Sequence, residues 1–127
     1  MKSIAIFLKQ SKNLEELYLS WNKIRGLGAL CISEAIGLSA LRALDLSWNS
    51  LASSENRSAV RALSDAIVNN STLLHLDISN NQLDVEDMAI FGESLAGNQV
   101  LIGVHVSGNQ GRLDSKGMLT TSALIVA

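Results

Sequence analysis

Cysteine is nearly absent from this chain of 127 residues, which contains only Cys31. A single cysteine cannot form an internal disulfide, and small secreted domains commonly depend on disulfides for stability. The sequence therefore favours a reducing compartment. We expect a cytoplasmic protein in which Cys31 is an inert, half-buried thiol.

Aromatic residues, excess positive charge and long apolar runs are scarce as well. Aromatics make up 4% of the chain and hydrophobic residues 47%, so the expected core is aliphatic. A net charge of −2 gives no basic surface for nucleic acid or anionic lipid. No run approaches the ~20 apolar residues of a membrane span. The apolar run at 4–8 is stopped by Lys9, which makes it too short for a secretory signal.

One phrase occurs four times in the chain. The copies LEELYLSWNKI, LRALDLSWNSL, LLHLDISNNQL and LIGVHVSGNQG begin at residues 14, 41, 73 and 101. Each has apolar residues at its first, fourth and sixth positions and asparagine at its ninth, and the eleventh is apolar except for Gly111. This is the L-x-x-L-x-L-x-x-N-x-L signature of a leucine-rich repeat, whose core segment is a strand.

A helix fits between successive copies, which are spaced by 27, 32 and 28 residues. The segments at 28–36, 59–67 and 87–95 align, and their apolar positions recur at offsets of three, four and seven, which make one helical face. The longer middle spacing indicates a polar loop insertion at 52–58. The pattern predicts parallel strands near 16–20, 43–47, 75–79 and 103–107, and helices near 28–38, 58–69 and 86–97.

Strand blocks followed by helices with the pattern G-A-x-x-L-x-x-A-L resemble the ribonuclease-inhibitor type of leucine-rich repeat, over residues 1 to about 111. The resemblance implies an α/β solenoid of about four repeats, a right-handed β-α superhelix with a curved parallel sheet inside and helices outside. It also implies protein binding far more often than catalysis.

The repeats predict one domain, 1–127, that is a piece of a longer solenoid, because no polar capping segment precedes the first repeat. Ile4, Phe7 and Leu8 have helical spacing and should form the core face of a helix from a preceding repeat. The expected units are that helix at 1–13, repeats at 14–40, 41–72 and 73–100, and a degenerate repeat with a tail at 101–127.

The asparagine column should be structural, with each amide satisfying backbone groups where the chain leaves a strand. Function should instead lie on the concave face of the sheet, because side chains alternate across a strand and the leucines point inward. Tyr18, Trp21 and Trp48 fall on or beside this face, and tryptophan and tyrosine often anchor interfaces. A structural alternative is that the tryptophans only cover the rim of the sheet. The predicted partner-binding residues are Tyr18, Trp21, Trp48, Glu16, Arg42, Asp45, His75, Asp77 and His105.

Asp45, Asp77, His75 and His105 contain carboxylates and imidazoles that could hold a transition metal or perform acid–base chemistry. A polar surface with an Asp77–His105 ion pair is the alternative that we favour, because an open sheet neither forms a pocket nor excludes water. We therefore expect no metal, no cofactor and no enzymatic activity.

Three functions fit the sequence. The first is an interaction module that binds a protein or peptide on the concave face. The second is a structural scaffold segment of a larger assembly, without its own ligand. The third is a GTPase-activating accessory role, for which Arg25 and Arg57 are candidates by loop position alone. The uncharged tail at 118–127 should either cover the last repeat or leave that end open to self-association.

Overall fold

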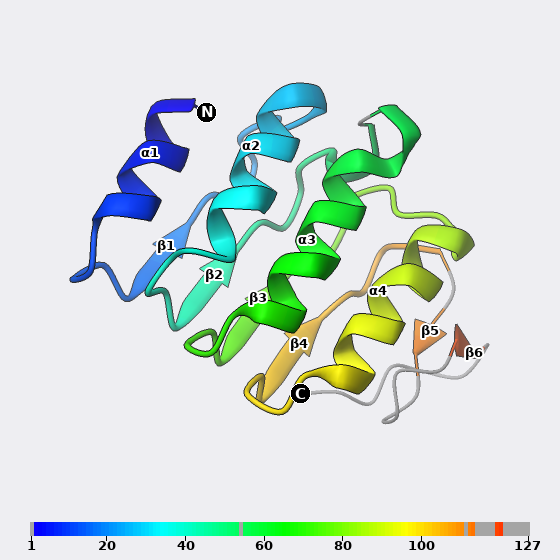
Figure 1. Cartoon of the computed structure of the whole chain (residues 1–127). Helices are drawn as coiled ribbons and strands as arrows, with labels where there is room; N and C mark the ends of the chain where they lie inside the picture. The colour runs from blue at the N-terminus through cyan, green and yellow to red at the C-terminus, as the bar shows by residue number, and fades with distance from the viewer. Residues whose placement is uncertain (1, 54, 111, 114–118, 121–127) are drawn as a thin grey trace.

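The computed structural model describes residues 2–53, 55–110, 112–113 and 119–120. Strands and helices alternate along the chain (Figure 1). The helices are α1 (Lys2–Gln10), α2 (Gly26–Ile36), α3 (Ser58–Asn69) and α4 (Val85–Gly97), with short 3₁₀ turns η1 (Leu51–Ser53) and η2 (Glu55–Arg57) before α3. The strands are β1 (Glu16–Tyr18), β2 (Ala43–Asp45), β3 (His75–Asp77), β4 (Gly103–His105), β5 (Arg112–Leu113) and β6 (Leu119–Thr120).

The four repeat strands form one parallel sheet in the order β1-β2-β3-β4. Their register pairs the same repeat position in each strand, so Leu17, Leu44, Leu76 and Val104 form one row. Each link between neighbouring strands β1 to β4 is a crossover that contains one of the helices α2, α3 or α4. The parallel solenoid of about four repeats expected from the sequence is confirmed.

Each of the four repeat strands is three residues long, two shorter than the sequence predicts. The strands end early because a left-handed residue follows three positions after each of them, at Trp21, Trp48, Asn80 and Gly108. Backbone bonds between repeats continue past the strand ends, for example from the Trp48 N–H to the Ser79 carbonyl at 2.9 Å. The repeats therefore stay in register through these turns.

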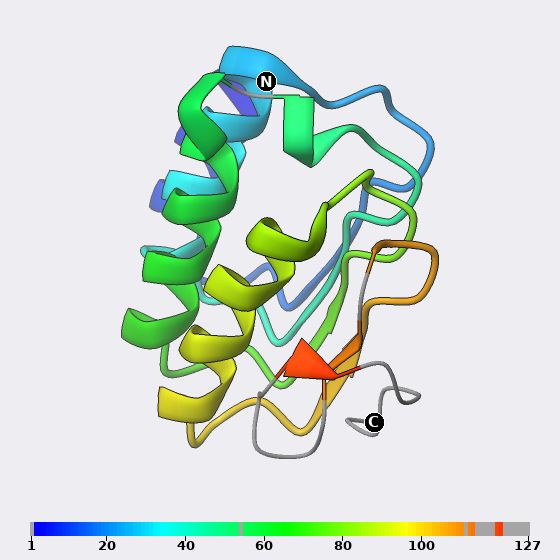
Figure 2. The same ribbon diagram turned by 90° about the vertical axis from the view of Figure 1, so that its right-hand side faces the viewer.

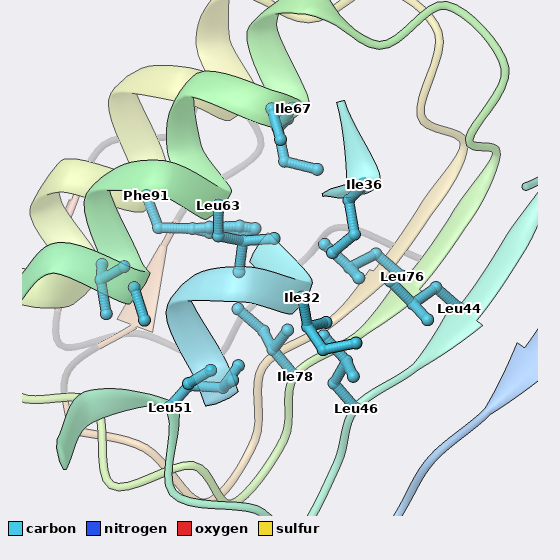
Figure 3. Close-up of a cluster of buried hydrophobic side chains, with 14 of the residues drawn as sticks. Ile32, Ile36, Leu44, Leu46, Leu51, Leu63, Ile67, Leu76, Ile78 and Phe91 are labelled. Carbon is cyan, nitrogen blue, oxygen red and sulfur yellow. The ribbon is translucent and has the colours of Figure 1, made fainter. Parts of the chain in front are cut away.

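The helices lie in one layer against one face of the sheet (Figure 2). The core fills the space between the layers, where Ile32 and Ile36 of α2, Leu63 and Ile67 of α3 and Phe91 of α4 surround the sheet leucines (Figure 3). These helix positions are the ones that the offsets of three, four and seven predict. Within the described residues no helix is long and apolar enough to cross a membrane.

One residue that the sequence predicts to lie in the core is exposed instead. Phe7 is 54% exposed, whereas Ala5 and Leu8 are the buried residues of α1. Among the described helices α1 is the first of the row and packs mainly on α2, so only one narrow stripe of it is covered. Helical periodicity finds the apolar residues of α1, but the width of the buried stripe depends on how many neighbours the helix has.

The asparagine column links neighbouring repeats, as expected. Asn49 Oδ1 accepts from the N–H groups of Asn22 and Ile24 in the preceding repeat, both at 3.0 Å. Its Nδ2 donates to the carbonyls of Leu19 and Leu46, both at 2.9 Å. Asn81 and Asn109 make the corresponding bonds one and two repeats further on.

Candidate functional site

The face of the sheet turned away from the helices, here called the open sheet face, carries six of the nine predicted binding residues. Strand register places them in two rows. Asp45 and Asp77 are half-buried, and the exposed side chains of Tyr18 and His105 lie at the two ends of their row. The first row is Tyr18, Asp45, Asp77 and His105, and the second is Glu16, Ala43, His75 and Gly103.

Between the two rows lies a shallow groove of about 350 Å³. Ala43 and Gly103 stand in the second row, and the small Ala43 side chain leaves room between its larger neighbours. This volume is near the lower limit of ligand sites, which run from roughly 300 to 1,000 Å³. The groove therefore has room for one or two side chains of a partner rather than for a large molecule.

Each aspartate in the groove is held by a serine two residues later. Asp45 Oδ1 accepts from both the N–H and the Oγ of Ser47, at 2.8 and 2.6 Å. Asp77 Oδ1 accepts from the N–H of Ser79 at 2.9 Å. Within the described residues, no hydrogen bond reaches the Oδ2 atom of either aspartate. One oxygen of each carboxylate therefore remains available to a ligand.

The serines were missed as contributors to this site. Ser47 and Ser79 are not among the binding residues predicted from the sequence, and both are buried. The available signal was the repeated D-x-S spacing, in which an aspartate accepts from the backbone two residues on. Among the ion pairs of the described residues there is none between Asp77 and His105, which the sequence suggested.

Tyr18 and Glu16 interact at the edge of the groove. The Tyr18 hydroxyl donates to Glu16 Oε1 at 2.5 Å. This bond, together with the negative charges of Glu16 and Asp45, raises the pKa of Tyr18 above its ordinary value. The aromatic ring of Tyr18 is 63% exposed and stays available for contact beside the carboxylates.

Trp21 and Trp48 stack on each other at the ends of their strands. Their ring centroids are 4.4 Å apart and the ring planes differ by 7°. The side chains are 69% and 47% exposed. The two indoles are therefore adjacent and partly accessible to solvent, and neither is a core residue.

Two arginines considered from the sequence are paired with carboxylates. Arg42 Nε lies 3.3 Å from Glu15 Oε1, in a pair exposed to solvent. Arg57 contacts three carboxylates of the α4 N-terminus, those of Asp84, Glu86 and Asp87, at 2.6, 2.8 and 2.7 Å. Because these contacts occupy its guanidinium, Arg57 is not a free arginine that could enter a nucleotide site.

The four histidine and aspartate residues suggested by the sequence are only partly brought together. Asp77 pairs in register with both Asp45 and His105, whereas His75 lies one row away. Among the described residues, no three histidine, cysteine or acidic side chains group closely enough to hold a metal ion. The groove is open to solvent along the sheet, and apolar, aromatic, imidazole and acidic side chains line it.

Strand-turn-helix units stacked on a continuous parallel sheet, with an asparagine bridging each pair of units, define a leucine-rich repeat solenoid. Comparison with known families agrees: the family described as Leucine Rich repeat matches residues 10–33 and 69–89, which include the strands β1 and β3. The two matched segments are similar to leucine-rich repeats. No curated protein proved similar to it. Repeats of this family are general protein-interaction modules and are usually non-catalytic.

Proposed function

We propose that this chain binds a protein or peptide segment on its open sheet face, with the stacked Trp21–Trp48 pair as the anchor. The observation that carries the proposal is the exposure of both indoles in a stacked pair. Tryptophan is enriched among the residues that contribute most to protein interfaces. A preassembled pair offers a large rigid surface whose ordering cost is already met in the free protein.

The backbone at both tryptophans supports this proposal. Trp21 has φ 62° and Trp48 has φ 56°, in the left-handed region that bulky residues rarely adopt. Such residues cost of order 1–3 kcal/mol each, and they are found most often at functional sites. The third and fourth repeats place Asn80 and Gly108 at the same point, residue types that accept this conformation easily. Folding alone therefore does not call for tryptophan at this point of the repeat.

The test is affinity capture from cell extract with the full chain and with the double variant Trp21→Asn/Trp48→Asn. Asparagine is the replacement because Asn80 already occupies the equivalent left-handed position. Captured proteins are identified by mass spectrometry and their affinity is then measured with purified components. We expect the double variant to retain a tenth or less of the binding constant, which corresponds to a loss above ~1.4 kcal/mol.

The matched control is Phe7→Asn, which removes another exposed aromatic from a helix at the far side of the sheet. It should leave the captured proteins and their affinities unchanged. A captured set that is identical for the wild type and the double tryptophan variant would contradict the proposal. It would favour a scaffold segment that has no ligand of its own on this face.

A further inference from the structure

The groove on the open sheet face has a charge that restricts its partner. Three carboxylates, those of Glu16, Asp45 and Asp77, line it together with the imidazoles of His75 and His105, and no lysine or arginine does. The chain as a whole has a net charge of only −2. Negative charge is therefore gathered on the part of the surface where the proposed partner would bind.

The arrangement of the two aspartates is unfavourable in the free protein. Asp45 and Asp77 are register partners on adjacent strands, which lie about 4.8 Å apart. Like charges directly opposite each other destabilise a sheet. Arg42, the arginine next to this strand in sequence, is paired with Glu15. A cation supplied by a partner would relieve the repulsion between the aspartates.

Aromatic surface and free carboxylate oxygens occur together here. The exposed ring of Tyr18 lies beside Asp45 in the sheet register, and the Oδ2 atoms of both aspartates lack a hydrogen bond within the described residues. A guanidinium group is planar, forms forked bonds to carboxylates and stacks on aromatic rings, whereas an ammonium group acts as a point charge. The combination fits arginine better than lysine.

We infer that the groove formed by Glu16, Tyr18, Asp45 and Asp77 binds an arginine side chain of the partner. This inference rests on the proposed function, since it assumes that a peptide or protein segment lies on the open sheet face. Trp48 follows Asp45 by three residues, roughly 10 Å of extended chain. A segment along the strands would therefore place an arginine in the groove and an apolar side chain on the tryptophan pair.

The test is selection of binders from a random peptide library displayed on phage, with the full chain as target. Peptides from the selected pool are then synthesised and titrated against the chain. Trp21 and Trp48 are its two tryptophans, so intrinsic fluorescence reports binding at this face directly. We expect the pool to be enriched in arginine. Replacing that arginine by uncharged citrulline should weaken binding by at least about tenfold, the loss of one charge-assisted pair.

Asp45→Asn/Asp77→Asn is the matching change in the protein. Each asparagine keeps an oxygen that can accept from Ser47 or Ser79, so the sheet should remain intact. The double variant should also weaken binding at least about tenfold and should remove the penalty for citrulline. The control is Asp65→Asn/Glu93→Gln, which removes two charges from helices α3 and α4 and should leave binding unchanged.

The outcomes separate the two proposals. Binding that requires Trp21 and Trp48 but is indifferent to citrulline and to Asp45→Asn/Asp77→Asn would overturn the arginine site and leave the proposed function intact. Binding that depends on arginine and the aspartates but not on the tryptophans would overturn the proposed anchor and support the groove. A pool without arginine enrichment would also overturn the inference.

Discussion

The asparagine at the ninth position of each repeat differs between repeats in its burial and in its hydrogen bonds. Asn81 is fully buried, accepts from the Leu51 N–H and donates to the carbonyls of Leu46 and Ile78. Asn22 is exposed, and its side chain donates to the Ser20 carbonyl. The difference follows from position, because among the described residues the loop before Asn22 has no neighbouring repeat to bridge. The same motif residue is therefore essential in one unit and dispensable in another.

This comparison gives a matched pair of substitutions. Asn81→Ala leaves buried backbone groups without partners and should lower the free energy of unfolding by about 1–3 kcal/mol. Asn22→Ala removes a solvent-exposed bond and should change it by less than ~0.5 kcal/mol. Urea denaturation followed by circular dichroism measures both. Equal losses would show that the bridge between repeats is not what Asn81 contributes.

The tryptophan pair should contribute little to stability. Trp48→Asn removes a stacking interaction worth about 0.5–1.5 kcal/mol but places a residue that tolerates a left-handed backbone. We therefore expect the free energy of unfolding to change by less than ~1 kcal/mol, whereas Phe91→Ala in the core should cost about 3–5 kcal/mol. The same urea experiment compares them. If Trp48→Asn destabilised the chain as much as Phe91→Ala, the indoles would be packing residues rather than a binding surface.

At the scale of elements, the repeat pattern predicts most of the fold because most of the repeated apolar positions are buried between units. The pattern fails to predict features that do not follow from the repeated apolar positions. Phe7 is exposed since α1 packs mainly on α2, and the strands stop at left-handed turns that the motif does not reveal. The rows of the open sheet face follow from alternation, but the roles of Ser47 and Ser79 depend on side-chain bonds.

The insertion in the second repeat shows the same limit. It was expected to be a simple loop, yet its 3₁₀ turn η2 ends at Arg57, which reaches the N-terminus of α4. There Asp84 and Asp87 form a capping box, and Arg57 balances their charges and that of Glu86. Long-range pairing of a loop arginine with a helix cap has no signal in the hydrophobic pattern. A basic residue in the insertion and an acidic cluster 27–30 residues later are the available hint.

Removing Arg57 should change how stability depends on pH. The hydrogen bond from Arg57 lowers the pKa of Asp84 below its ordinary 3.8. A carboxyl with a lowered pKa in the folded state stabilises the fold above its ordinary pKa, and this contribution is lost as pH falls through the lowered value. Arg57→Ala should therefore lower the melting temperature at neutral pH and reduce the fall in melting temperature on acidification below 3.8.

Melting temperatures measured across that pH range check this expectation. Arg57→Lys is the control, since it keeps one charge but cannot contact three carboxylates with a planar fork. It should give an intermediate result. Wild-type and Arg57→Ala curves that ran parallel from neutral to acidic pH would show that Arg57 does not couple to the α4 cap.

At the scale of the molecule, the two outer edges of the four-stranded sheet are the places where the solenoid could be extended or covered. Within the described residues no strand pairs with the outer side of β1 or of β4. β5 and β6 instead form a separate antiparallel pair beside α4 (Figure 1). Most of the tail at 118–127 lies outside the described residues, but Leu119–Thr120 is the strand β6. In the part of the chain that the structure describes, β5 and β6 therefore cover part of α4, and no strand pairs with the outer edge of β4.

Deleting residues 118–127 removes β6. The strand β5 then loses its pairing partner, and α4 loses its contact with β6. Uncovered apolar surface and an unpaired strand edge favour association between chains. We expect the shortened chain to melt at a lower temperature and to show a larger, concentration-dependent mass in light scattering. The control is deletion of residues 121–127 alone, which keeps β6 and should keep the mass and melting temperature of the full chain. A chain lacking 118–127 that stayed monomeric and equally stable would mean that β6 does not cover this end and that the β4 edge needs no cover.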